Sequence, residues 1–175
     1  MILTFSQILN NKQTYFIEKI WSCLYYNRIN FEEEFNEYNS EFKIKFQGAI
    51  FLNRGVTAPK RHTIRKDSAN RWKADNDIHF TINPRTKNQF QFAPVIKCVS
   101  VQNIWIQSHT KIILVENYLN DDKTITDNCF WKELQKDEII NLIKNDGFEN
   151  TDDFWNYFNQ TDFYGKIIHW TNLKY

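Results

Sequence analysis

The middle of the chain, residues 62–126, is a succession of short apolar runs separated by polar turns, a pattern typical of β-strands. Residues 62–65 and 78–82 are short strand candidates, and residues 95–107 form the longest one. Three further features are predicted: a strand at 111–116, a turn at 120–123 and a hairpin strand at 124–126. This run of short strands predicts a small sheet.

The longest strand candidate has an irregular pattern. Its apolar positions change parity between Val101 and Ile104, which predicts a β-bulge near Gln102. Cys98 lies in the same apolar run and is expected in the core. Three tryptophans are also expected in the core: Trp21, Trp105 and Trp155.

Helical patterns precede and follow the strands. Residues 4–29 and 30–46 carry apolar side chains at spacings of three and four, and residues 130–145 repeat this spacing. Gly147 stands where a left-handed helix end is expected, and a last helix begins near Thr151. The closing segment 165–171 is a predicted strand, in which His169 is expected to be a buried core residue.

Helices on both sides of a run of short strands predict an α+β fold with a small curled sheet or barrel. We expect one domain over residues 1–175, with a helical N-terminal extension at 1–58 packed on a core at 59–175. The hydrophobic fraction of 42% and the aromatic fraction of 17% indicate a compact globular protein.

Charge and cysteine content limit the function classes. The net charge of +1 excludes a generally polycationic nucleic-acid binder, so any recognition of nucleic acid must be local. The three cysteines are widely spaced and suggest neither a disulfide framework nor a zinc site. We find no signal-peptide pattern and no run of about 20 apolar residues. A soluble cytoplasmic protein with no metal, cofactor or membrane partner is therefore expected.

Residues 59–80 are the richest part of the chain in chemically versatile side chains. Basic residues at 60, 61, 65, 66, 71 and 73 surround His62, Thr63 and Trp72. Such a cluster can bind phosphate, stack a base or support acyl transfer. The simpler interpretation is a solvated basic face. A nuclease would use His62 or His79 as general acid–base, but nothing in the spacing favours one.

Four segments together resemble the ASCH domain of the PUA-like superfamily. Lys-Arg-His-Thr-Ile-Arg at 60–65 looks like the Lys-x-x-Thr-x-Arg motif of that family, and residues 73–80 resemble the turn and strand that follow it. Asn-Asp-Gly-Phe at 145–148, with Phe154 and Phe158, is similar to the Glu-Gly-Phe segment and its helix. Residues 165–170 resemble the closing strand.

The resemblance implies a small β-barrel with flanking helices and a cleft beside the motif strand. Relatives bind RNA or modified nucleotides, and some are amidohydrolases that deacetylate acetylated cytidine. Carried over by motif, the catalytic residues would be Lys60, Thr63 and Asp146, where Asp146 replaces a longer glutamate.

Three functions remain open. The first is an RNA-, DNA- or modified-nucleotide-binding module. Its expected contacts are Arg61, His62, Arg65, Arg71, Trp72, Lys73, Arg85, Lys87 and Trp170. The second is the amidohydrolase. The third is a protein-interaction domain that uses the acidic, aromatic region at 30–46. The sequence does not indicate an oligomeric state.

Overall fold

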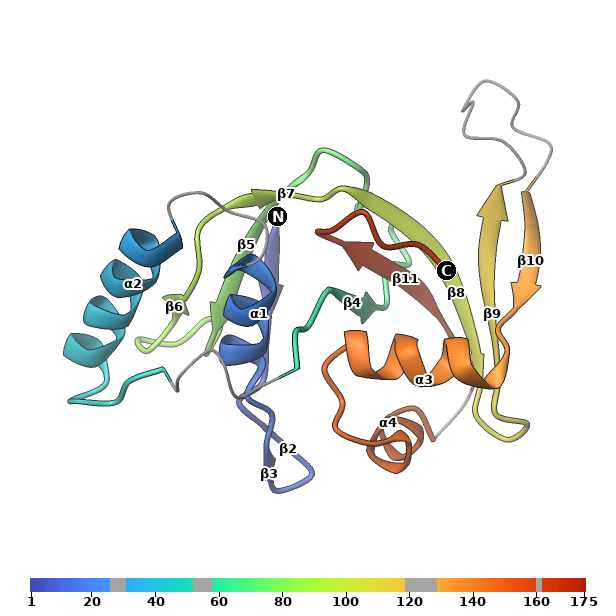
Figure 1. The fold of residues 1–175 in the computed structure, drawn as a ribbon, viewed down its shortest axis with the longest axis horizontal. Coiled ribbons are helices and arrows are strands. Elements are labelled where there is room, and N and C mark those ends of the chain that lie inside the picture. The colour runs from blue at the N-terminus through green and yellow to red at the C-terminus, as the bar shows by residue number, and fades with distance from the viewer. Residues whose placement is uncertain (26–30, 52–57, 119–128, 160–161) are drawn as a thin grey trace. The chain divides into compact units, whose positions relative to one another are not determined.

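The computed structural model describes residues 1–25, 31–51, 58–118, 129–159 and 162–175 (Figure 1). The fold is α+β, as predicted. The chain forms two compact units, one of Met1–Arg61 with Asn76–Lys97 and the other of His62–Asp75 with Cys98–Tyr175. The first unit therefore contains the predicted extension at 1–58 together with a later segment of the chain.

The first unit begins with strands, so the helix predicted over residues 4–29 was wrong in its first half. The three strands are β1 (Ile2–Thr4), β2 (Ile8–Leu9) and β3 (Lys12–Gln13). Asn10 and Asn11, at φ 49° and 59°, form the tight turn between β2 and β3. Asparagine tolerates left-handed backbone, which is why an Asn pair suits a two-residue hairpin turn.

Strand β1 pairs in parallel with β5 (Asp77–Ile82), a strand predicted from the sequence. Two short strands complete this sheet by pairing with β5: β6 (Phe90–Gln91) and β7 (Ile96–Lys97). The side chain of Phe5, which follows β1, lies 5.9 Å from the rings of both Phe80 and Phe92. This aromatic cluster forms part of the core of the first unit.

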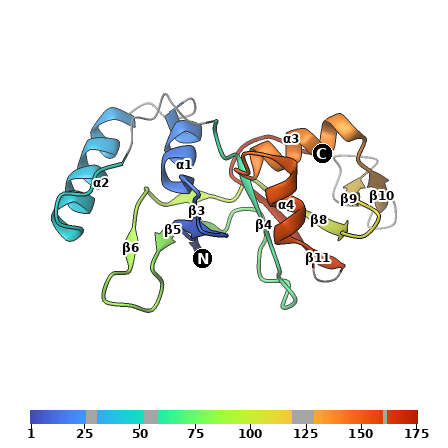
Figure 2. The same cartoon turned by 90° about the horizontal axis from the view of Figure 1, so that it is seen from below.

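Helices α1 (Phe16–Tyr25) and α2 (Phe31–Lys45) lie side by side in the first unit (Figure 2). Trp21 of α1 is fully buried, as expected, and its indole Nε1 donates a 2.9 Å hydrogen bond to the carbonyl of Phe92. The same indole packs edge-on against Phe35 of α2, with ring centroids 5.2 Å apart. Trp21 thus joins both helices to the sheet.

The second unit contains a five-stranded antiparallel sheet in the order β10-β9-β8-β11-β4 (Figure 1). Its strands are β4 (His62–Arg65), β8 (Ser100–Gln107), β9 (Ile112–Tyr118), β10 (Cys129–Glu133) and β11 (Phe163–His169). Helices α3 (Lys136–Asn145) and α4 (Thr151–Tyr157) contribute Leu142, Ile143 and Phe154 to the core under one face of this sheet.

Two predictions in this unit were wrong. The region 130–145 begins as strand β10 and becomes helical only at Lys136, because β10 pairs antiparallel with β9. No bulge occurs at Gln102, which pairs regularly with Ile167. The parity changes because Gln102, a polar residue, is buried on the same side as Ile104 and Ile106. The predicted turn and strand at 120–126 lie outside the described residues.

The strands that the structure describes form a four-stranded, a five-stranded and a two-stranded sheet, and none of these closes into a barrel. Within the same residues, no helix is long and apolar enough to cross a membrane. Cys98 is buried in the core as expected, and burial raises the pKa of its thiol to about 11.

Candidate functional site

The residues predicted to form one site are divided between the two units. Lys60 and Arg61 belong to the first unit, as do Arg85 and Lys87, which are exposed in the loop between β5 and β6. The remaining candidates belong to the second unit: His62, Thr63, Arg65, Arg71, Trp72, Lys73, Asp146 and Trp170. The motif at 60–65 thus crosses from one unit to the other at the Arg61–His62 peptide bond.

Lys60 is 1% exposed, which is rare for a lysine. Its backbone N–H donates a 2.9 Å hydrogen bond to the carbonyl of Lys19 in α1. Its ammonium lies 4.7 Å from the centre of the Phe16 ring and 5.9 Å from that of Phe5, where the ring faces attract a cation. The Lys60 side chain is therefore buried in the first unit beside the rings of Phe16 and Phe5.

Strand β4 divides the motif residues between the two faces of the sheet. Ile64 lies in the core beneath one face, so the alternation of a strand places His62 on that side and Thr63 and Arg65 on the other. Thr63 is nevertheless only 2% exposed. Lys60 precedes the strand, which begins at His62.

Asp146 follows the last turn of α3 and reaches β4. Its carboxylate Oδ1 accepts a 3.2 Å hydrogen bond from the backbone N–H of Ile64 and lies 3.8 Å from Nδ1 of His62. The backbone at Gly147 then turns with φ 90°, as predicted. The helix end and the strand thus bring together Asp146 and His62, two residues that the sequence proposed for separate roles.

His62 is fully buried and belongs to a polar cluster with Tyr175. Its Nε2 lies 2.8 Å from the hydroxyl of Tyr175, which also accepts a 3.0 Å hydrogen bond from Nδ2 of Asn145. The Tyr175 hydroxyl is thus shared between Asn145 and Nε2 of His62, while Nδ1 of His62 faces Asp146.

Gln102 connects Tyr175 to the second buried histidine. Its Nε2 donates to the carbonyls of Glu116 (3.3 Å) and Tyr175 (3.0 Å), which fixes the orientation of the carboxamide. Its Oε1 therefore accepts from the N–H of Tyr175 and from Nε2 of His169, each at 3.1 Å. Burial, with a smaller effect of Lys174, lowers the pKa of His169 to about 4, so this histidine is neutral at pH 7.

The loop after β4 is fixed to the sheet by a buried ion pair. Nζ of Lys166 lies 3.4 Å from Oδ2 of Asp67 and donates a 3.1 Å hydrogen bond to the carbonyl of Trp72. Asp67 also accepts from the N–H groups of Arg71 and Trp72. Burial alone would raise the pKa of Asp67, but these backbone donors and the Lys166 ammonium outweigh it and hold the pKa below its usual value.

This arrangement exposes cations and buries the loop tryptophan. Lys66, Arg71 and Lys73 are exposed, whereas Trp72 is 6% exposed. Trp170, the other proposed stacking residue, is also 6% exposed. Neither indole presents an open face for a base.

A different aromatic pair does reach the surface. Tyr164 is 55% exposed and stacks on Trp105, with ring centroids 4.9 Å apart and planes 19° apart. Trp105 was expected in the core, but its parity is opposite to that of buried Ile104 and Ile106. The sequence could have revealed the pair, because Trp105 lies between Ile104 and Ile106 on one strand. Successive side chains of a strand point to opposite faces, so a tryptophan between two core residues faces outward.

The aromatic pair lies on the same sheet face as the basic residues of the motif. Register pairs Tyr164 with Trp105 and Lys166 with both Asn103 and Arg65. Two residues along a strand cover about 6.8 Å, so the Tyr164 and Lys166 positions are neighbours on this face. Lys166 in turn holds the exposed loop. We refer to Tyr164, Trp105, Lys66, Arg71 and Lys73 as the basic–aromatic surface.

Comparison with known proteins gives no relative: no family model, no curated protein and no solved structure matches this chain. Among the residues that the structure describes, no group of three or more His, Cys, Asp or Glu side chains could hold a metal ion. The chemistry must therefore be argued from the side chains alone. Both His62 and His169 are fully buried, an arrangement suited to stabilising the fold rather than contacting a polynucleotide.

Proposed function

We propose that the protein binds nucleic acid or a modified nucleotide through the basic–aromatic surface, as an ASCH-type module. The observation that carries the proposal is the stacked pair of exposed Tyr164 and half-buried Trp105 on the sheet face that holds the basic loop. Binding of a single strand needs aromatic faces for bases and cations for phosphates, both within reach of a few nucleotides.

The cationic half of the surface is the loop 66–73. Lys66, Arg71 and Lys73 are exposed, and the one acidic residue among them, Asp67, is paired with Lys166. The loop therefore presents a local excess of positive charge on a protein whose net charge is only +1. Guanidinium and ammonium groups bind phosphate oxygens by charge-assisted hydrogen bonds.

The aromatic half is ordered before any ligand arrives. The indole Nε1 of Trp105 donates a 3.3 Å hydrogen bond to Asp162, and the Tyr164 ring stacks on the indole. A base stacked on such a ring contributes about 1–3 kcal/mol, and a preformed platform loses little side-chain entropy on binding.

The test is fluorescence anisotropy of short labelled single-stranded RNA and DNA at several salt concentrations. Replacing Arg71 and Lys73 together by Ala is expected to weaken binding about tenfold and to reduce the slope of log K against log salt by about 1.4, because two phosphate contacts are lost. Tyr164→Ala is expected to weaken binding about tenfold with little change in slope. The control is Lys43→Ala with Lys45→Ala, which removes two exposed cations from α2 of the first unit. Equal effects of the control and the loop variant would contradict the proposal.

An amidohydrolase acting on an acetylated cytidine is the second candidate. The observation that favours it is the burial of all three residues carried over by motif: Lys60, Thr63 and Asp146 are 1%, 2% and 5% exposed. The motif resemblance assigns Thr63 as nucleophile, Lys60 as base and Asp146 as polar partner of the lysine, with Lys60 in the first unit and the other two in the second. Incubation with acetylated cytidine and chromatography of released cytidine tests this activity, with Thr63→Val as the near-isosteric variant. Absence of turnover by the wild type would exclude this reaction.

A further inference from the structure

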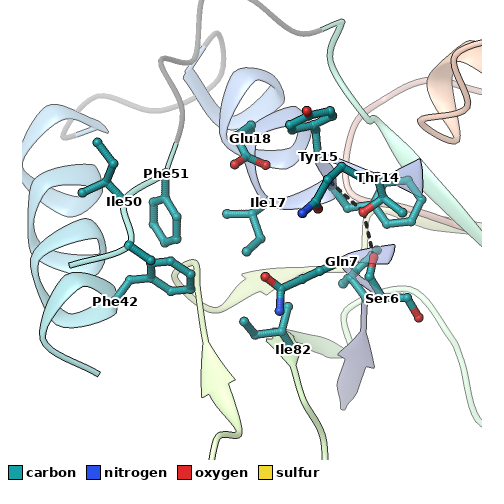
Figure 3. A pocket seen from close by; sticks show the side chains of 14 residues that line it. Ser6, Gln7, Thr14, Tyr15, Ile17, Glu18, Phe42, Ile50, Phe51 and Ile82 are labelled. Atoms are coloured by element: carbon teal, nitrogen blue, oxygen red, sulfur yellow. Dashed lines mark hydrogen bonds between the residues drawn. The ribbon is translucent and has the colours of Figure 1, made fainter. Parts of the chain in front are cut away.

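A pocket of about 260 Å³ lies entirely within the first unit (Figure 3). None of the predicted site residues lines it, but Phe5 and Phe16, the two rings near the Lys60 ammonium, do. Its apolar lining comes from Phe5, Phe16, Ile17, Phe42, Phe51 and Ile82. The labelled side chains show Phe42, Phe51 and Ile50 on one side, with Ile17 and Gln7 facing them. The size suits one or two fused rings rather than a chain, since pockets for drug-sized ligands start at about 300 Å³.

The pocket is asymmetric in polarity. Gln7, just before the β2–β3 hairpin, and Glu18 of α1 lie on the side away from Phe42 and Phe51 (Figure 3), and Gln13 of the hairpin also lines the pocket. Thr14 fixes the base of this hairpin, because its hydroxyl donates a 2.7 Å hydrogen bond to the carbonyl of Ser6. A ligand would thus contact aromatic rings on one side and hydrogen-bonding groups on the other.

Charge decides which ligands fit. Among the residues that the structure describes, the lining includes Glu18 and no lysine or arginine, which disfavours a phosphate or carboxylate. A cation is also disfavoured, because the Lys60 ammonium already lies over the Phe16 ring and near Phe5. The lining therefore selects an uncharged ligand.

The carboxamides specify the polar groups of that ligand. In the part of the chain that the structure describes, neither the Gln7 nor the Gln13 side chain makes a hydrogen bond. Each carboxamide offers a donor and an acceptor, which matches the alternating donors and acceptors on the edge of a nucleobase. The adjoining backbone is also strained, since Tyr15 at the rim has φ 53°, a conformation that bulky residues adopt only at an energetic cost and that is concentrated at functional sites.

We infer that this pocket binds an uncharged planar heterocycle of the nucleobase class, as a free nucleoside, with the ring packed against Phe42 and Phe51 and its edge on Gln7 and Gln13. This site is separate from the basic–aromatic surface and does not depend on it.

The test is calorimetric titration of the intact protein with adenosine, cytidine, guanosine and uridine, and with choline and inorganic phosphate as charged probes. At least one nucleoside is expected to bind, and choline and phosphate are not. Gln7→Leu is expected to weaken nucleoside binding about tenfold, because one hydrogen-bonding partner is lost. Ala49→Trp, a substitution at an exposed position that lines the pocket, is expected to abolish binding by filling it.

The matched control is Ile44→Trp, which adds the same bulk to the exposed face of α2 outside the lining. It is expected to bind like the wild type. Binding of no nucleoside by the folded wild type, preference for choline, or equal binding by the Ala49→Trp variant would each overturn the inference. The RNA assay separates the two sites, because Ala49→Trp should leave binding at the basic–aromatic surface unchanged.

Discussion

The buried histidine of β11 makes a quantitative prediction about stability and pH. His169 is fully buried and its pKa is lowered from 6.5 to about 4, first by burial and then by the charge of Lys174. The unfolded chain takes up this proton near pH 6.5 but the folded chain does not. The contribution of His169 to the free energy of unfolding should therefore be fully present above pH 6.5. It should fall as the pH drops toward 4, by about 2.5 kcal/mol between pH 7.5 and 4.5.

The measurement is urea unfolding followed by tryptophan fluorescence at half-unit steps between pH 4.5 and 7.5. His169→Gln removes the titration and keeps an amide donor for Gln102, so the decline in its free energy of unfolding should be shallower by about 2.5 kcal/mol. His109→Gln changes an exposed histidine and serves as the control, with a profile like that of the wild type. Asp67 does not contribute to this decline, because its pKa is lowered from 3.8 and the stability that it provides is lost only at lower pH. Parallel profiles for the wild type and His169→Gln would refute the reasoning.

Three further substitutions test the packing by urea unfolding at pH 7. Lys166→Met leaves the carboxylate of Asp67 buried without its cation and should cost about 3 kcal/mol, whereas the double change with Asp67→Asn should recover part of that loss. Gly165→Ala places a methyl group 2.5 Å from the carbonyl oxygen of Arg65 and should cost about 2 kcal/mol. No loss would mean that β11 and β4 can move apart at this position without an energetic cost. Trp21→Phe removes a buried indole donor and should cost about 2 kcal/mol, with a null effect contradicting its role between helices and sheet.

The parts of the fold that could be predicted are those with a local cause. Strand β5 and helix α2 follow their apolar periodicity, and the left-handed turn at Gly147 follows from its missing side chain. The errors fall where pairing is non-local. Strand β1 is extended because it pairs with β5 more than 70 residues later, and β10 is extended because it pairs with β9.

The candidate site shows the same limit. The sequence identified the basic residues of the 66–73 loop, and three of them are exposed. It could not foresee that Asp67 and Lys166 would bury Trp72, because that contact joins residues about 100 positions apart. The proximity of Asp146 to His62 likewise depends on where α3 ends against the edge of β4.

The carboxamide of Gln102 has an evolutionary consequence. It bonds the backbone N–H and carbonyl of Tyr175 as well as Nε2 of His169, so replacing Gln102 removes a partner from all three groups, and replacing His169 removes a donor to Oε1 of Gln102. Substitutions there should be strongly epistatic, each harmful alone. Joint replacement of the side chains at 102 and 169 by apolar ones of similar volume removes both polar members of the Gln102–His169 pair and should recover part of the loss of either single change, although the Tyr175 backbone still loses its Gln102 partner. Residues 102 and 169 are therefore expected to drift together or not at all.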